Sequence, residues 1–289
     1  MDEKTKNGMG WLPDIPDFRD LTVDNKKIKP LLKTMGISET QNELPGSVDL
    51  RKWCSPVEDQ GKLGSCTAHA GVGMLEYFER KAYGKHIDAS RLFLYKTTRN
   101  LMQQSGDTGA FLRTTMSALV LFGVLPEEYY PYIIEEYDQE PPAFCYSYAQ
   151  SYQALKYVNL DPPNTTQDEL LARIKTNLAA GIPSMFGFTV YNSLWSAKNG
   201  EIPLPCPKEK VEGGHAIMVV GYHDQMEIEN PNCGNKTTGA LLIRNSWGSK
   251  WGEGGYGWLP YQYVLSGLAQ DWWTLMDNEW FDSGEFSLE

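Results

Sequence analysis

Three residues that could carry out nucleophilic chemistry lie far apart in this 289-residue sequence. Cys66 stands in the run D-Q-G-K-L-G-S-C-T, His215 follows two glycines, and Asn245 precedes S-W-G. A thiol can attack a carbonyl carbon, an imidazole can take up its proton, and a carboxamide can hold the imidazole in place. Together these residue types predict acyl transfer through a thioester on Cys66.

The residues around Cys66 suit that role. From Ser65 to Gly84, apolar residues recur at three- and four-residue spacing, which predicts a helix that Cys66 opens. A helix N-terminus lowers the pKa of a thiol, as does a nearby imidazolium. Gln60 precedes Cys66 by six residues across a glycine-containing loop. Its side-chain N–H could join the Cys66 backbone N–H in an oxyanion hole.

His215 and Asn245 are placed by apolar runs that read as strands. His215 begins one run and Asn245 lies near the end of another, where its carbonyl oxygen could accept from the imidazole. That bond would turn the ring toward Cys66. His69 is closer to Cys66 in sequence but lies on the same predicted helix, so we expect it to serve packing.

The remaining pattern divides the chain into a helical half and a strand-rich half. Residues 1 to about 44 are polar, are broken by glycines and prolines, and show no helical pattern, which predicts an extended arm. The last residues, from Asp277 on, are acidic. We expect helices at 89–102, 110–122 and 166–180, and strands at 183–190, 215–222, 240–246 and 255–259.

Composition excludes several classes of partner. The net charge of −11 argues against binding to a nucleic-acid backbone. No apolar segment approaches the roughly 20 residues that span a bilayer. The first residues, M-D-E-K-T-K, lack the apolar stretch of a secretion signal, so the sequence as written predicts a soluble, cytoplasmic protein. A sequence cut after such a signal would instead belong to a secreted or lysosome-like protein.

The sequence has five cysteines, an odd number, and none of them are spaced as a pair. A disulfide framework or a zinc cluster is therefore not expected. Free thiols in a reducing compartment are the simpler expectation. One or two bridges stay open among Cys54, Cys145, Cys206 and Cys233.

Three sequence blocks resemble those of the papain-like cysteine peptidases. They are D-Q-G-x-x-G-S-C at 59–66, G-G-H-A-I-M-V-V-G-Y at 213–222 and R-N-S-W-G-S-K-W-G-E-G-G-Y at 244–256, in the family's order and spacing. The resemblance covers about residues 45–275. It implies an α+β fold with a helical left subdomain, an antiparallel β-barrel right subdomain and the active-site cleft between them. The implied partner is a peptide or protein substrate, and we expect no metal and no cofactor.

The resemblance also assigns roles to residues. By it, Cys66 is the nucleophile with a lowered pKa, His215 the acid and base, Asn245 the orienting residue and Gln60 the oxyanion donor. Trp247 would shield the bond between His215 and Asn245 from water. The residues expected to bind an extended substrate are Gly64, Ser65, Gly109, Gly214 and Trp247. The main pocket, beside Gly214 and the 183–190 strand, is expected to accept an apolar or aromatic side chain.

Two departures from the family pattern are informative. The family usually has a disulfide-forming cysteine at Leu63 and an aromatic residue at Thr67, so the chain resembles an atypical, disulfide-poor member. The arm is shorter than the helical propeptide of the longer-known members. It is expected either to cross the cleft, anchored by residues 11–18, or to pack on the back of the barrel.

The resulting expectation is a monomeric cysteine endopeptidase regulated by its arm. Dipeptide-releasing members of the family use a histidine-bearing loop, and none of the four histidines falls between 87 and 214. An acyltransferase or transglutaminase-like enzyme and a non-catalytic binding protein remain as alternatives. The expected divisions are the arm at 1–44, the helical subdomain at 45–150, the barrel subdomain at 151–275 and an acidic tail at 276–289.

Overall fold

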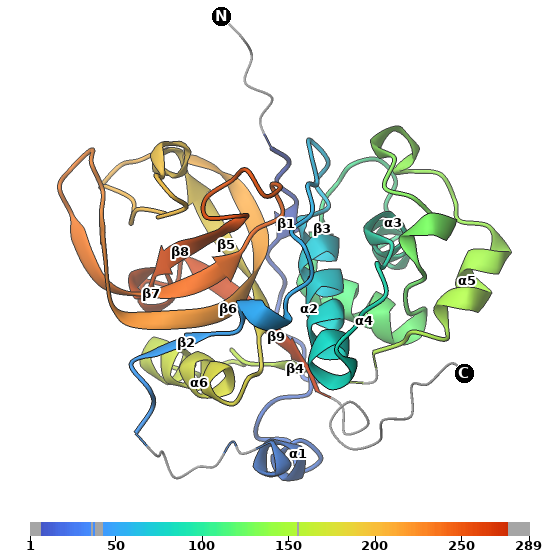
Figure 1. Cartoon of the computed structure of the whole chain (residues 1–289), viewed down its shortest axis with the longest axis horizontal. Helices are drawn as coiled ribbons and strands as arrows, with labels where there is room; N and C mark the ends of the chain where they lie inside the picture. Colours follow the sequence, from blue (N-terminus) through green and yellow to red (C-terminus); the bar gives the residue numbers. More distant parts are fainter. Residues whose placement is uncertain (1–6, 36, 38–42, 155, 277–289) are drawn as a thin grey trace, which may run out of the picture.

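A helical half and a sheet half lie side by side in the computed structural model of this chain (Figure 1). The structure describes residues 7–35, 37, 43–154 and 156–276. Of the expected acidic tail, only Met276 is among them, and its side chain is buried. The fold class expected from the sequence, α+β with helices and an antiparallel sheet in separate halves, is confirmed.

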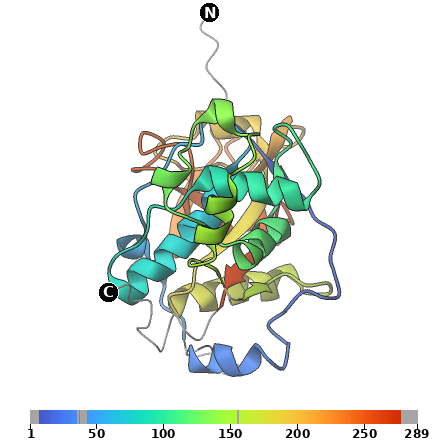
Figure 2. The same ribbon diagram turned by 90° about the vertical axis from the view of Figure 1, so that its right-hand side faces the viewer.

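The helical half faces the viewer in Figure 2. Its central helix, α2, is buried along most of its length and ends at Gly84, which adopts the left-handed conformation that glycine tolerates best. The helix α3 is capped by the Ser90 hydroxyl, which accepts from the backbone N–H of Phe93. The bounds are α2 Cys66–Tyr83, α3 Arg91–Leu101, α4 Leu112–Leu121 and α5 Ala143–Ala149.

The sheet half is built on antiparallel strands in the order β4-β9-β5-β6-β7-β8, and β2 pairs with β6 from outside this path. Two helices belong to this part of the chain, α6 (Gln167–Ala179), which begins with a Thr166–Glu169 capping box, and α7 (Tyr261–Leu265). The strands are β2 Ser47–Asp49, β4 Tyr157–Asn159, β5 Ser184–Tyr191, β6 Val211–Glu229, β7 Lys236–Arg244, β8 Tyr256–Pro260 and β9 Ala269–Leu275.

A small parallel pair lies between the two halves (Figure 1). It joins β1 (Trp11–Leu12), from the N-terminal segment, to β3 (Ala110–Phe111), which directly precedes α4. The same N-terminal segment carries the short helix α1 (Lys29–Thr34), which buries Leu31 and Leu32. The absence of helix expected for residues 1–44 is therefore wrong, because one short apolar run is enough when it packs on the body of the protein.

Most of the expected long elements are confirmed, and the short ones were not foreseen. The expected helices at 89–102, 110–122 and 166–180 correspond to α3, α4 and α6, and the four expected strands to β5–β8. The sequence analysis did not predict α1, α5, α7 or β9. These are short segments whose packing depends on contacts that are distant in sequence.

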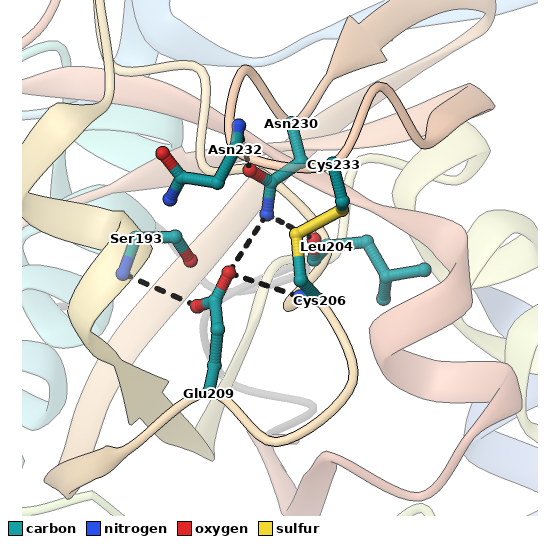
Figure 3. Close-up of a disulfide and its surroundings, with 7 residues drawn as sticks. All are labelled: Ser193, Leu204, Cys206, Glu209, Asn230, Asn232 and Cys233. Carbon is teal, nitrogen blue, oxygen red and sulfur yellow. Dashed lines mark hydrogen bonds between the residues drawn. A yellow bond between two sulfur atoms is a disulfide. The ribbon is translucent and has the colours of Figure 1, made fainter.

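One disulfide corrects the expectation of free thiols. Cys206 and Cys233 are bonded, with their Cα atoms 6.1 Å apart (Figure 3). The bond ties the segment before β6 to the turn between β6 and β7. Around it, Glu209 accepts from the backbone N–H of Cys206 and from the Asn230 side chain, and Asn230 also donates to the Leu204 carbonyl. The spacing of the cysteines along the sequence could not reveal this pair, because the two loops come together only when β6 folds.

The other three cysteines, Cys54, Cys66 and Cys145, are free and buried. A single bridge in the chain agrees with the disulfide-poor character expected from Leu63. Within the part of the chain that the structure describes, no helix has both the length and the apolar character needed to cross a membrane.

Candidate active site

Cys66 lies at the first position of α2, as the sequence predicted, and is completely buried. The helix points its N-terminus toward β6 across the junction of the two halves. The backbone N–H of Ala216, on β6, donates to the Cys66 sulfur at 3.4 Å. Because Ala216 directly follows His215, the thiol lies beside the histidine backbone.

His215 and Asn245 form the expected pair. The Nε2 atom of His215 lies 2.8 Å from the Asn245 carboxamide oxygen, and both residues are buried. A carboxamide oxygen can only accept, so Nε2 carries the proton and a neutral ring leaves Nδ1 as the acceptor. Nδ1 has no hydrogen-bond partner among the described residues. This nitrogen is therefore free to take a proton.

Tryptophans cover the imidazole. The Trp247 ring stacks on the His215 ring with centroids 4.6 Å apart and planes 23° apart, and Trp195 stacks on the outer face of Trp247. Trp247 is almost fully buried, whereas Trp195 is 42 % exposed. The arrangement fits the expected shielding of the His215–Asn245 bond, because water has little access through two stacked rings.

Gln60 is held so that its amide N–H groups act as donors. The Ser246 hydroxyl donates to the Gln60 carboxamide oxygen at 2.5 Å, which fixes the orientation of the side chain. The Gln60 nitrogen donates to the carbonyl oxygens of Leu63, at 2.8 Å, and Gly8, at 3.0 Å. Gln60 is completely buried.

Two residues that support this arrangement were missed at the sequence level. Ser246 follows Asn245 directly, so its place in the N-S-W run could have suggested a role. Tyr132 donates its hydroxyl to the Gln60 backbone carbonyl and bonds the Ser65 hydroxyl, at 3.0 and 2.6 Å. No local signal marks Tyr132, since it lies 72 residues from Gln60.

Burial sets the protonation of Cys66 and His215. Burial raises the pKa of the Cys66 thiol to about 11, although backbone hydrogen bonds from Ala216 and Gly10 act in the opposite direction. Burial also lowers the pKa of His215 to about 4, against the effect of its bond with Asn245. The expected lowering of the Cys66 pKa is thus wrong for this covered arrangement, in which both groups are neutral near pH 7.

His69 takes no part in the pair. Its Nδ1 lies 3.1 Å from the Ser65 carbonyl oxygen, and its ring meets Tyr132 edge to face. Burial lowers the pKa of His69 to about 3. These contacts join the ring to Ser65 and Tyr132, which agrees with a packing role.

The residues expected to bind substrate lie around Cys66, and three of them contact the N-terminal segment. Gly64 and Gly109 face Gly10, since a Cβ added at Gly10 would stand 1.8 Å from the Gly64 oxygen. Gly214 faces Trp11. The Ser65 hydroxyl is buried against Tyr132, so Ser65 offers only its backbone to a ligand.

The donor set does not resemble a metal centre. In residues 7–35, 37, 43–154 and 156–276, no three His, Cys, Asp or Glu side chains are grouped in a way that could hold a metal ion.

Comparison with known proteins agrees with the geometry. The profile of the papain family cysteine proteases matches residues 44–272. An uncharacterised peptidase C1-like protein of Acanthamoeba polyphaga mimivirus is 34% identical over 96% of this chain and 89% of its own length. Pro-cathepsin H of Mus musculus is 29% identical over 78% of this chain and 63% of its own length.

A solved structure extends the likeness to almost the whole chain. Xylellain, a cysteine protease from Xylella fastidiosa, superposes with a TM-score of 0.73 and 33% identity, over 95% of this chain and 98% of its own. The profile match and these relatives establish a cysteine peptidase. The chain belongs to the papain family of cysteine proteases.

Proposed function

We propose that this peptidase is an endopeptidase that cleaves peptide bonds through a thioester on Cys66. The observation that carries the proposal is the bond from His215 Nε2 to Asn245, which leaves Nδ1 as an unpartnered acceptor. The residue after His215, Ala216, donates its backbone N–H to the Cys66 sulfur. A free acceptor and a thiol at a helix N-terminus are the two parts that acylation requires.

The reaction follows from these positions. Nδ1 of His215 takes the thiol proton, and the Cys66 sulfur attacks the carbonyl carbon of the scissile bond. The oxyanion that forms accepts from the Gln60 side chain and the Cys66 backbone N–H. His215 then gives its proton to the leaving amine as the C–N bond breaks, which leaves an acyl group on Cys66.

Hydrolysis completes the cycle. A water molecule loses a proton to His215 and attacks the thioester carbon. The C–S bond breaks, the peptide leaves as a carboxylic acid, and the proton returns to the Cys66 sulfur. Asn245 holds the ring throughout, so that the same Nδ1 atom serves both steps.

Capped peptides test the endopeptidase assignment. A peptide blocked at both ends has no free terminus for an exopeptidase to bind, so internal cleavage of such a peptide is expected. Cys66→Ala should abolish the cleavage, and Cys145→Ala, which removes a buried thiol far along the chain, should leave it intact. Turnover that survives Cys66→Ala, or cleavage only of peptides with a free end, would refute the assignment.

We propose further that the N-terminal arm inhibits the enzyme by lying in its cleft. Three contacts support this: Gln60 donates to the Gly8 carbonyl, Gly10 packs on Gly64, and the Ala110 N–H donates to the Gly10 carbonyl at 2.7 Å. The burial of Trp11, which is 6 % exposed, supports it as well. A Gln60 donor that is bound to Gly8 is not free to bind an oxyanion.

The anchor of the arm differs from the expected residues 11–18. Trp11 is buried, but Ile15 and Phe18 are 79 % and 98 % exposed. Arg113 supplies a second attachment, through ion pairs to Asp14 and Asp20. We take Trp11 and the two aspartates as the anchor, because exposed apolar side chains contribute no binding surface.

The division of the body at about residue 150 also stays a proposal. Helices α2–α5 fall within 45–150 and strands β4–β9 within 151–275, which supports it. The strand β2 is the exception, since its residues pair with β6.

The expected monomer and the expected cytoplasmic location stay predictions. The Cys206–Cys233 disulfide weighs against a reducing compartment, because such bonds persist chiefly in oxidising surroundings.

A further inference from the structure

Trp195, the outer of the two tryptophans over His215, lies just beyond the end of a strand. Pairing between β5 and β6 ends at Tyr191, and Trp195 belongs to the short 3₁₀ helix η4 (Asn192–Ser196) that follows. Trp195 is 42 % exposed, so burial holds it less firmly than it holds Trp247. The attachments of η4 therefore decide how well the outer ring covers the inner one.

One carboxylate ties η4 to two other segments. Oε2 of Glu209 accepts from the backbone N–H of Ser193, in η4, at 3.3 Å, and Oε1 accepts from the backbone N–H of Cys206 at 2.9 Å (Figure 3). Oε1 also accepts from the Asn230 side chain at 3.1 Å. Burial raises the pKa of Glu209, but the bonds from these donors outweigh it and leave the pKa below its usual range. Both oxygens are thus charged acceptors at neutral pH.

The disulfide closes the same place. Cys206, whose N–H meets Glu209, is bonded to Cys233, which lies three residues after Asn230. The Asn230 side chain donates both to Glu209 and to the Leu204 carbonyl, the latter at 2.7 Å. A covalent bond and several hydrogen bonds therefore form one junction, which joins η4, the segment before β6 and the turn after it (Figure 3).

The junction is connected to the imidazole through two stacked rings. Ser193, which the carboxylate holds, is two residues from Trp195. Trp195 stacks on Trp247 with centroids 5.7 Å and planes 19° apart, and Trp247 in turn stacks on His215. Movement of η4 away from Trp247 would give water access to this stack. A hydrogen bond from the imidazole is weaker where water competes for it, because the local dielectric is higher.

We propose that Glu209 is a positioning residue, which together with the disulfide keeps Trp195 stacked over the cover of His215. The inference rests on the proposed function, in which His215 is the acid and base. Glu209 acts through η4 and not on the reacting atoms. Its bond to Ser193 makes opening of η4 rare, and each opening lets water reach the bond between His215 and Asn245.

Exchange of the His215 ring proton measures the cover directly. The Nε2 proton is bonded to the Asn245 oxygen, so the intact chain, prepared with isotope-labelled histidine, should give a downfield NMR signal that exchanges slowly with water. Loss of the signal in Asn245→Ala assigns it. The measurement needs no substrate and does not depend on turnover.

Glu209→Gln is the sharpest change, because an amide keeps the shape of the side chain but only one of its two acceptor oxygens. That oxygen can stay with Cys206, and the bond from Ser193 is then lost. Loss of one bond to a charged acceptor should raise the exchange rate at least about tenfold. Trp195→Ala, which removes the outer ring, should raise the rate at least as far. Glu227→Gln is the matched control, since it removes an exposed carboxylate of β6 and should leave the rate unchanged.

Turnover shows whether the cover matters for catalysis. With a capped peptide, kcat of the intact chain should fall about threefold to tenfold in Glu209→Gln, because water then competes for the bond that orients the ring. KM should change less than about twofold, since no contact with substrate is removed. Glu227→Gln should match the unsubstituted enzyme in both constants.

The outcomes separate the inference from the function on which it rests. Equal exchange rates in Glu209→Gln and Glu227→Gln, or a signal that is already in fast exchange in the unsubstituted chain, would overturn the proposed role of the junction. Faster exchange with an unchanged kcat would overturn Glu209 as a positioning residue. If no capped peptide is cleaved, the proposed function fails, and the exchange rates still decide whether Glu209 holds the cover in place.

Discussion

Cys66, the proposed nucleophile, is a buried, neutral thiol in the intact chain. Its raised pKa, about 11, and the lowered pKa of His215, about 4, have the same cause, which is loss of water around both groups. Gly10 and Trp11 are part of what excludes that water. Under the proposed inhibition by the arm, we expect reactivity at Cys66 to depend on whether the N-terminal segment is in place. The position of Cys66 at a helix N-terminus does not offset the effect of burial on its pKa.

Alkylation by iodoacetamide should report this state. At pH 7 a thiol of pKa about 11 is thiolate to about one part in 10⁴, so Cys66 of the intact chain should react slowly and faster as pH rises. Trp11→Ala should speed the reaction at pH 7. Peptide mapping separates Cys66 from the buried thiols of Cys54 and Cys145. Rapid modification of Cys66 in the intact chain at pH 7 would contradict this account.

Gln60 should act mainly in the transition state. Its side-chain nitrogen is oriented by Ser246 and is expected to donate to the oxyanion. In enzyme lacking residues 1–20, Gln60→Ala should lower kcat about 10²–10³-fold with a small change in KM. Gln153→Ala is the matched control, because that side chain bonds the Leu121 carbonyl at the surface. Equal effects of the two substitutions on kcat would show that Gln60 does not stabilise the oxyanion.

At the level of elements, Arg113 of α4 adds an electrostatic attachment to the contacts that hold the N-terminal segment. Arg113 pairs with Asp14 at 2.5 Å and with Asp20 at 2.8 Å, and it donates to the Ile15 carbonyl. These groups are mostly buried, so the pairing is stronger than that of an exposed ion pair. Loss of Arg113 should weaken the attachment of the N-terminal segment without changing the residues proposed to carry out catalysis.

Arg113→Gln should therefore raise the peptidase activity of the intact chain roughly tenfold. Arg19→Gln is the control, since Arg19 pairs with Asp17 at the surface and its side chain is 77 % exposed. The gain from Arg113→Gln should disappear in enzyme lacking residues 1–20, which retains α1. A gain of equal size in the shortened enzyme would mean that Arg113 acts through something other than the arm.

The Cys206–Cys233 disulfide is a second feature that joins separate segments of the fold. It links residues 27 positions apart, and a closed loop of that length reduces the entropy of the unfolded chain. Replacing both Cys206 and Cys233 by serine should lower the free energy of unfolding by about 2–4 kcal/mol. Urea denaturation monitored by tryptophan fluorescence measures the change. An unchanged midpoint would show that Glu209 and Asn230 hold the loops by themselves.

For the molecule as a whole, the sequence predicted what depends on local pattern and on recognisable blocks. The three- and four-residue spacing after Ser65 predicted α2, and with it the position of Cys66 at a helix start. The blocks around His215 and Asn245 predicted two strands, and the resemblance predicted the bond that joins them. Each of these features is encoded in a short stretch of chain.

The parts that could not be predicted depend on contacts between distant segments. Trp11 and Asp271 are 260 residues apart, and neither has neighbours that suggest an indole–carboxylate bond. Burial raises the pKa of Cys66, and the side chains that bury it come from segments whose contacts sequence spacing does not reveal. The pairing of Cys206 with Cys233 likewise follows from the path of β6.

The central claim is that Cys66 carries the acyl group during turnover. Enzyme lacking residues 1–20 would be mixed with a p-nitrophenyl ester of a capped amino acid, quenched in acid and analysed by mass spectrometry. We expect one acyl group per chain, located on the peptide that contains Cys66, and a much smaller yield from the intact chain. Ester turnover without an adduct on Cys66, or with the adduct on another residue, would contradict the claim.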